Sequence, residues 1–393
     1  MISNTECSHN GHHRQRTRCM ADRRYCRYNN AAHIRAAIDS VVRQTDQRVN
    51  IIVVNDGSRD DTLKRIQSLV AGYPSATRAR VLVIDQPNAG VATVRNLTID
   101  RTTTPFLTFL DGDDYWLRDY YTRLEALIGD VSALIAGEVD LIEYNAIADP
   151  GGLTAREGWT GDRLLPFNAL GDYRGPLTPE QLEQLFITSE WYVWTRIYRL
   201  SLFDSLRFPE TLHFEDMMLT PLLYLRARQV IATREALIAY RINPHGQARN
   251  TRLRDLEDVG RIIEQHAELA HQSQGEERRL MALLACQDAL YYKTVANRID
   301  GYFASLPRIR QVIKSLRPLK ARHQLALPSN TRLLMLSPLL SNLYSWLKWL
   351  QLECRRAIRP APSGSFVQWY RPGRRAHADG GGNARSDHRP PGP

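Results

Sequence analysis

The stretch Phe106-Leu107-Thr108-Phe109-Leu110-Asp111-Gly112-Asp113-Asp114 decides the fold that we predict for this chain. Its first five residues are mostly apolar and lie between Pro105 and Gly112, which is typical of a short buried strand. The strand ends in three carboxylates, at the edge where open α/β sheets bind ligands. A hard divalent cation prefers one or two such carboxylates together with phosphate oxygens. Taken alone, the same stretch could equally be a solvated acidic turn.

The rest of the first 150 residues repeats one pattern, an apolar strand followed by an amphipathic helix. The first strand of the pattern ends at Asn55-Asp56-Gly57-Ser58, a turn that can begin a helix. Strands that alternate with helices at this pace are typical of an α/β fold with a doubly wound, mainly parallel sheet. We expect strands at 49–54, 81–84, 106–110 and 139–142.

Composition divides the chain into four parts. Residues 1–27 are rich in arginine and are expected to be disordered, and residues 28–245 carry the α/β pattern. A helical C-terminal region is predicted for 246–360, and a disordered tail rich in Gly, Pro and Arg for 361–393. Within the α/β part, the Gly- and Pro-rich segment 150–177 is expected to be a mobile insertion near the ligand edge.

The charge and cysteine content narrow the function classes. The chain has 393 residues and a net charge of +10, which favours anionic partners. Much of this excess lies in the two ends, without the aromatic and basic interleaving of a nucleic-acid platform, so nucleic-acid binding ranks last. The five cysteines have no regular spacing, which argues against disulfides and structural zinc and favours the cytoplasm.

Residues 333–350 are the most apolar section of the C-terminal region. No uninterrupted apolar run in the chain reaches membrane-spanning length. The periodicity favours a core helix broken at Pro338, and a helix lying in the membrane interface is the alternative. Peripheral contact with the inner membrane face therefore stays open.

Four motifs give the α/β part a family resemblance. They are Val53-Val54-Asn55-Asp56-Gly57-Ser58, Asn88-Ala89-Gly90 through Val94-Arg95-Asn96, Leu110-Asp111-Gly112-Asp113-Asp114 and Phe214-Glu215-Asp216. Each motif is short, but their order and spacing over residues 28–245 make the combination specific. The chain resembles the inverting family 2 glycosyltransferases, which have the GT-A fold. The resemblance implies a nucleotide-diphospho-sugar donor and a glycan or lipid-linked acceptor, as in cell-surface polysaccharide synthesis.

The resemblance also implies a role for five residues. Asp56 would accept a hydrogen bond from the nucleobase, and Arg95 would donate near the base and the phosphates. Asp111 would contact the ribose and help Asp113 to hold Mg²⁺ or Mn²⁺, which would stabilise negative charge on the leaving group. Asp216 would be the general base that takes the proton from the acceptor hydroxyl.

Each role has a purely structural alternative. Asp56 could cap a turn, Arg95 could be a solvated helix residue, and Asp216 could be an acid favoured by the start of a helix. Trp191 and Trp194 are more often core residues than platforms that stack on a sugar.

One departure from the family pattern affects the predicted activity. The family places an apolar strand before a Tyr-Asn pair, but here Tyr28-Asn29 follows an arginine-rich segment. Unpaired arginines are costly in the centre of a sheet, so we expect this first strand to be lost, through a frame or start error upstream of Tyr28. The rival functions are thus a catalytically impaired relative and, less favoured because of Tyr115, an aspartyl phosphotransferase.

Overall fold

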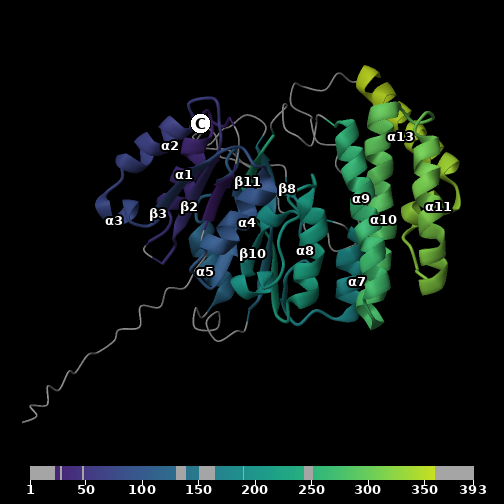
Figure 1. Ribbon diagram of the computed structural model, residues 1–393, viewed down its shortest axis with the longest axis horizontal. Helices are drawn as coiled ribbons and strands as arrows, with labels where there is room; N and C mark the ends of the chain where they lie inside the picture. The colour runs from purple at the N-terminus through teal and green to yellow at the C-terminus, as the bar shows by residue number, and fades with distance from the viewer. Residues whose placement is uncertain are drawn as a thin grey trace, which may run out of the picture.

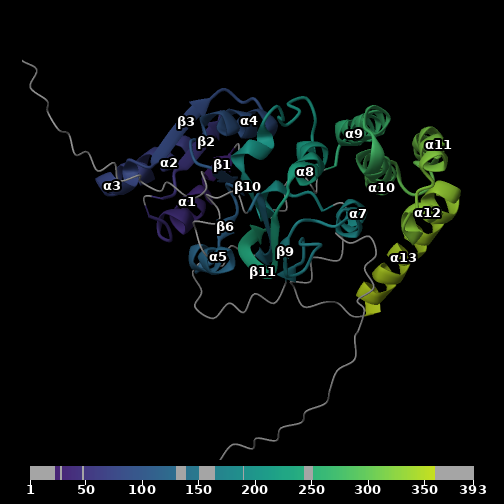
Figure 2. The ribbon, with the colours of Figure 1, turned by 90° about the horizontal axis from the view of Figure 1, so that it is seen from below.

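The computed structural model describes residues 23–26, 29–46, 48–129, 139–149, 164–188, 190–242 and 251–358. Two β-sheets with their covering helices form one side of the molecule, and five C-terminal helices form the other (Figures 1 and 2). The acid-tipped stretch links the two sheets, because β4 (Phe106–Thr108) belongs to one and β5 (Leu110–Asp111) to the other.

The first sheet is parallel and has the order β3-β2-β1-β5. Its strands β2 (Ile51–Asp56) and β3 (Val81–Gln86) confirm two of the predicted strands. Alternate residues of β2 point to opposite faces, as strand geometry requires. Ile51 and Val53 pack with helices α1 (Ile34–Val42) and α2 (Thr62–Ala71), and Ile52 and Val54 pack with α4 (Val91–Arg101).

The second sheet corrects the predicted fold class, because it is mixed. Its order is β4-β10-β7-β11-β6, and β10 (Arg196–Arg199) lies antiparallel to both β4 and β7 (Leu141–Asp149). Among the strand pairs that the structure describes in this sheet, the β7–β11 pair alone is parallel. The fold is therefore α/β with one parallel and one mixed sheet, in place of a mainly parallel one. The remaining elements of this half are β6 (Tyr115–Trp116), β8 (Leu164–Leu165), β9 (Tyr173–Gly175), β11 (Val230–Arg241), α3 (Ser75–Arg78), α5 (Tyr120–Ile128), α7 (Pro179–Thr188), α8 (Glu215–Arg226), η1 (Val193–Thr195) and η2 (Leu200–Phe203).

The first strand, predicted to be lost, is present. Strand β1 (Arg23–Cys26) pairs in parallel with β2 on one side and with β5 on the other. The backbone explains the discrepancy: without β1, the facing N–H and C=O groups of β2 and β5 would lack strand partners, and any residue type can supply backbone hydrogen bonds. The prediction of disorder is thus wrong for Arg23–Cys26. The rest of 1–27 and the predicted tail 361–393 lie outside the described residues.

The segment predicted as a mobile insertion is only partly described. Residues 150–163 lie outside the described residues, whereas β8 and β9 join the second sheet through antiparallel pairs with β7 and β11. Asn168 fixes the turn between them, since its side chain donates to the carbonyl of Thr233 at 2.7 Å and accepts from the amide of Leu170. Two short strands of the segment 164–177 are consequently part of the second sheet.

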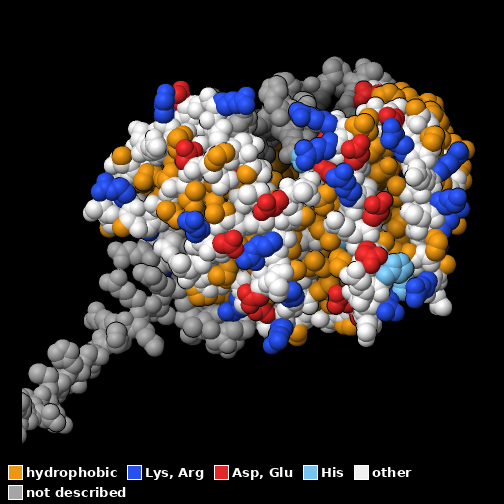
Figure 3. Space-filling view, in the orientation of Figure 1, with side chains coloured by type: hydrophobic (Ala, Val, Ile, Leu, Met, Phe, Trp, Pro, Cys, Tyr) orange, Lys and Arg blue, Asp and Glu red, His pale blue; other side chains and the backbone are white. Residues whose placement is uncertain are grey.

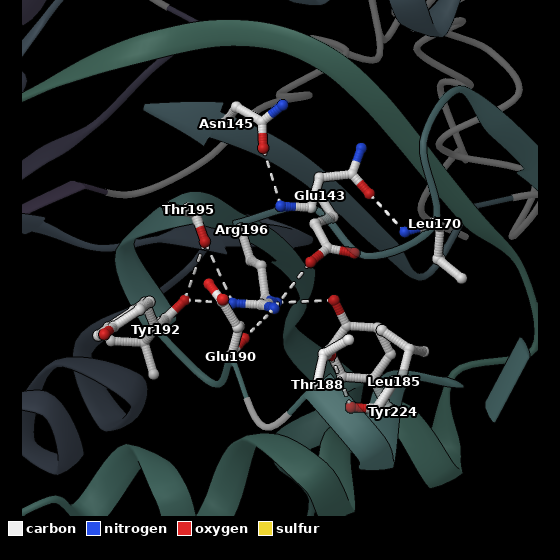
Figure 4. Close-up of polar contacts among 12 residues, drawn as sticks. Glu143, Asn145, Leu170, Leu185, Thr188, Glu190, Tyr192, Thr195, Arg196 and Tyr224 are labelled. Atoms are coloured by element: carbon white, nitrogen blue, oxygen red, sulfur yellow. Dashed lines mark hydrogen bonds and ion pairs between the residues drawn. The ribbon is translucent and has the colours of Figure 1, made fainter. Parts of the chain in front are cut away.

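A buried ion pair of Arg196 joins β10 to β7, and a hydrogen bond of the same side chain joins β10 to α8. The guanidinium of Arg196 is 1% exposed and donates to Glu143 at 2.8 Å and to the Tyr224 hydroxyl at 2.7 Å (Figure 4). It also donates to the carbonyl oxygens of Glu190 and Tyr192. Burial raises the pKa of Glu143, while the charge of Arg196 opposes that rise. One side chain thus closes the turn before β10 and ties it to two neighbouring elements.

The variant Arg196→Lys is expected to lower the free energy of unfolding by about 1–3 kcal/mol. Lysine keeps the charge but lacks the planar fork that reaches these acceptors together. Urea unfolding of both proteins measures the difference. The matched control Arg35→Lys, at an exposed position of α1, should change stability by less than about 0.5 kcal/mol. Equal losses in the two variants would contradict the role given to Arg196.

The C-terminal region is helical, as predicted. Its helices are α9 (Leu253–Gln272), α10 (Gly275–Asp300), α11 (Leu306–His323), α12 (Ser329–Leu336) and α13 (Pro338–Ile358). The predicted break at Pro338 is confirmed, because α12 ends at Leu336 and α13 begins at Pro338. Among the helices that the structure describes, none has the length and hydrophobicity needed to cross a membrane.

Candidate functional site

The carboxyl ends of β2 and β5 lie at one edge of the parallel sheet. Strand β1 separates them and pairs with both, so Asp56 at the end of β2 and Asp111 at the end of β5 emerge on the same side. Ligands of open α/β sheets bind at this edge. The strand pairing thus brings the two acids to one edge of the sheet.

Asp56 supports the loop that leads into α4. Its carboxylate accepts hydrogen bonds from the backbone amides of Ala89 and Gly90, both at 2.9 Å, and from the side chain of Gln86. Asn88 returns a side-chain hydrogen bond to the carbonyl of Asp56. A carboxylate has about four acceptor positions, so these three bonds leave room for one further donor. The turn-stabilising alternative therefore applies to Asp56 without excluding ligand contact.

Asp111, Asp113 and Asp114 form an acidic cluster. One carboxylate oxygen from each lies within 4.8 Å of the other two. Asp113 and Asp114 are buried, and Oδ1 of Asp114 accepts the backbone amide of Arg241 at 2.8 Å. Three carboxylates at this separation are a donor set that suits Mg²⁺ or Mn²⁺. The residues present therefore fit the predicted ion, and Asp114 extends the predicted pair to three.

Gly112 packs closely against the side chain of Asn30. A Cβ atom at this position would lie 2.7 Å from the side-chain nitrogen of Asn30, which precedes α1. Asn30 in turn is held by its own backbone amide, which donates to the Thr62 hydroxyl at 2.7 Å. The start of α1 thus lies directly against the acidic cluster.

Arg95 connects the acidic cluster to the start of α8. Its guanidinium forms an ion pair with Glu215, and it lies 3.6 Å from Oδ1 of Asp111. The side chain is 6% exposed, and its guanidinium lies beside the rings of Phe109 and Phe208. A buried charge of this kind is stable only with opposite charges at hand. The solvated-helix alternative for Arg95 is therefore wrong.

Asp216 lies beside this ion-pair network. Burial raises the pKa of its carboxyl group, the positive charge of Arg95 lowers it, and the negative charge of Asp111 raises it. The net pKa is above the ordinary value of 3.8. These electrostatic interactions place Asp216 near both Arg95 and Asp111, which are the residues that the sequence predicts to bind the donor.

The loop before Asp216 is strained and is braced by the C-terminal helices. Phe214 has a φ of 61°, a left-handed conformation that residues with a Cβ rarely adopt. Its ring packs edge-on against Tyr291 of α10 at 5.4 Å. Nδ1 of the preceding His213 forms a hydrogen bond with Asp255 at 2.7 Å, and the backbone amide of His213 donates to Asp258 of α9. The helical region consequently fixes the position of the start of α8.

The structure therefore brings together Arg95, Asp111, Asp113 and Asp216, and places Asp56 at the same sheet edge. Sequence reasoning missed the pairing of Glu215 with Arg95 and the position of Asp114, although both lie inside motifs that it singled out. It also missed Asn96, whose side chain accepts the amide of Phe208 and donates to its carbonyl, both at 2.8 Å. The prediction that Trp191 and Trp194 are core residues is confirmed, since both are buried.

The comparisons with known proteins agree with this arrangement. The Glycosyl transferase family 2 model matches residues 26–168. The glycosyltransferase GlyA of Streptococcus pneumoniae is 30% identical over 55% of this chain and 29% of its own length. The uncharacterized glycosyltransferase EpsJ of Bacillus subtilis is 31% identical over 56% of this chain and 60% of its own length. The chain thus spans less than two thirds of the length of each of these relatives.

The fold has a close counterpart among solved structures. A crystal structure of S. aureus TarS, residues 1–349, in complex with UDP-GlcNAc superposes with a TM-score of 0.61 at 16% identity. The match covers 84% of this chain and 92% of TarS 1–349. Residues 26–168 therefore match glycosyl transferase family 2, and the structure has a GT-A-like fold.

Proposed function

We propose that this chain transfers a sugar from a nucleotide-diphospho-sugar donor to a hydroxyl group of a glycan or lipid-linked acceptor, with inversion at the anomeric carbon. The proposal places this reaction in the synthesis of a cell-surface polysaccharide on the cytoplasmic side of the membrane. The observation that carries it is the ion-pair network of Arg95, which links the acidic cluster to the start of α8. The donor class is supported by TarS, a protein of the same fold that binds UDP-GlcNAc.

In this proposal Asp216 acts on the acceptor. Its carboxylate takes the proton from the acceptor hydroxyl as the oxygen bonds to the anomeric carbon, while the bond from that carbon to the diphosphate breaks. A pKa above the usual range makes Asp216 a stronger base than an exposed aspartate. The positive charge of Arg95 lowers this pKa and so opposes the effect of burial.

The other residues hold the donor. Asp113 and Asp111, joined by Asp114, would hold Mg²⁺ or Mn²⁺. When bound, the ion would neutralise negative charge on the diphosphate leaving group. Asp111 would also contact the ribose, and Asp56 would use its remaining acceptor position for the nucleobase. Arg95 fixes the orientation of Asp111 and adds positive charge near the phosphates.

The presence of β1 weakens the rival of an impaired enzyme. That alternative depended on the loss of the first strand, and β1 pairs with both of the strands that carry Asp56 and Asp111. The proposed donor site depends on this parallel sheet, and β1 fills the position between β2 and β5.

A screen of nucleotide-sugars for thermal stabilisation tests the proposal. With Mn²⁺ present, the true donor class should raise the stability of the chain by about 2.7 kcal/mol at a concentration 100 times its Kd. UDP-GlcNAc belongs in this screen with the GDP- and dTDP-sugars. Chelation of the metal should remove most of the effect, because the diphosphate then meets three carboxylates without a neutralising ion.

The variant Asp113→Asn should lose this metal-dependent stabilisation, since it removes one negative oxygen from the acidic cluster. Asp61→Asn, an exposed acid just before α2, is the matched control and should respond like the wild type. Stabilisation that persists in Asp113→Asn would contradict the proposed metal site. A lack of response to every nucleotide-sugar would contradict the proposed donor class.

A further inference from the structure

Helix α13 packs with its polar side inward and its apolar side outward. Ser341 and Asn342 are buried, at 2% and 0% exposure, whereas Leu340 and Tyr344 are 53% and 51% exposed. This is the reverse of the usual arrangement, in which the apolar stripe of a helix faces the core. The exposed apolar residues, here called the outer face, are Leu339, Leu340, Tyr344 and Leu347 of α13, with Leu336 at the end of α12.

Specific hydrogen bonds fix this orientation. Asn342 and Asn297 of α10 exchange side-chain hydrogen bonds of 3.0 and 3.1 Å, and Asn342 also donates to the carbonyl of Tyr302 at 2.6 Å. The ammonium group of Lys293 donates to the hydroxyls of Ser341 and Ser345, both at 2.9 Å. A rotation of α13 that buried its leucines would leave these polar groups without partners, at a cost. The outer face is therefore a stable feature of the fold.

The segment of sequence that contains the outer face is strongly basic. Residues 306–358 contain ten Lys or Arg residues and one acidic residue, Glu353. Exposed examples are Arg332, one turn before Leu336, and Lys348, which lies 5.9 Å from the ring of Tyr344. Figure 3 shows hydrophobic side chains gathered over α13 at the upper right, with Lys and Arg side chains nearby.

We propose that the outer face docks α13 onto an anionic lipid bilayer, with the helix lying in the plane of the interface. Apolar residues on one side of a helix, with basic residues around them, are the composition of an interfacial helix. The 21 residues of α13 carry too little hydrophobicity to cross a bilayer. A second copy of the chain is a poorer occupant, because two such faces would bring like charges together.

Vesicle co-sedimentation of the full chain tests the proposal. Vesicles that contain phosphatidylglycerol should bind the wild type at least about tenfold more tightly than vesicles of phosphatidylcholine alone, and added salt should weaken this binding. The double variant Leu340→Glu/Leu347→Glu should lose at least about tenfold in binding, since it places charge where leucine enters the lipid.

A double variant of the same chemistry serves as the control. Leu82 and Leu253 are exposed leucines away from α13, at 45% and 47%, and Leu82→Glu/Leu253→Glu should bind vesicles like the wild type. Thermal unfolding in the absence of vesicles checks that both variants fold. Equal vesicle binding by the wild type and the α13 variant would overturn the proposal. The proposal would also be overturned if the wild type formed a dimer that does not bind vesicles and the α13 variant were monomeric. Because no nucleotide-sugar is present, neither result depends on the proposed transferase activity.

Discussion

Replacement of Asp216 by asparagine is expected to reduce sugar transfer by about 10²–10⁴-fold, the usual contribution of a well-placed general base. Asparagine has nearly the same shape but cannot accept the proton from the acceptor hydroxyl. Donor binding should be retained, because the acidic cluster and Asp56 are unchanged. The measurement is the initial rate of transfer, or of donor hydrolysis, beside nucleotide-sugar stabilisation of the same variant.

The pH dependence gives this prediction a second, independent readout. The pKa of Asp216 is raised above 3.8 by burial, so the wild-type rate should fall with decreasing pH at a higher pH than an exposed aspartate would give. The residual rate of Asp216→Asn should lack this acidic limb. A wild-type profile that stays flat until an ordinary aspartate titrates would contradict the role of general base.

Folding stability should change in the opposite direction to activity. A raised pKa means that the folded state binds a proton more tightly than the unfolded state, so this group stabilises the fold at low pH. That contribution is lost as the pH rises through the raised pKa, and charged Asp216 then destabilises the fold at neutral pH. At neutral pH the free energy of unfolding of Asp216→Asn should therefore equal or exceed that of the wild type. Asp204→Asn, at an exposed position, should alter neither activity nor stability.

The sequence predicted the parallel sheet well because local patterns define its parts. Strands β2 and β3 have β-branched, apolar residues next to polar turns. Asp56 is the last residue of β2, and Asp111 is the last residue of β5. Strand β1 was missed because the arginines of 23–26 oppose a sheet interior, whereas its pairing depends on backbone groups of β2 and β5 that are distant in sequence. The local composition of residues 23–26 cannot show that two distant strands leave room for a third strand between them.

The mixed sheet and the orientation of α13 were not predicted, for related reasons. Strand β10 is short and carries two arginines, and its antiparallel pairs with β4 and β7 join residues roughly 50 to 90 positions apart. For residues 333–350, periodicity predicted a core helix broken at Pro338. The break is confirmed, but the core placement is wrong for α13, because its apolar side faces outward. The side that faces the protein depends on Asn297 and Lys293 in another helix, which supply partners for the polar side.

The buried charges around Arg95 lead to the second large effect that we expect. Arg95→Met should lower the free energy of unfolding by about 3–5 kcal/mol, because it leaves the buried carboxylate of Glu215 without its partner. Methionine is similar in length and keeps contact with Phe109 and Phe208, so the loss is mainly electrostatic. Chemical unfolding measures it. Arg101→Met, at an exposed position of the same helix, should cost less than about 0.5 kcal/mol.

A second substitution separates the lost charge pair from lost packing. In Arg95→Met/Glu215→Gln the unpaired carboxylate is also removed, so the double variant should recover part of the stability lost in Arg95→Met. Donor-induced stabilisation should nevertheless stay weaker than in the wild type, since Asp111 has still lost the positive charge 3.6 Å from its carboxylate. Additive losses in the double variant would contradict the Arg95–Glu215 pair. Full donor response would show that Arg95 braces the fold without helping to hold the diphosphate.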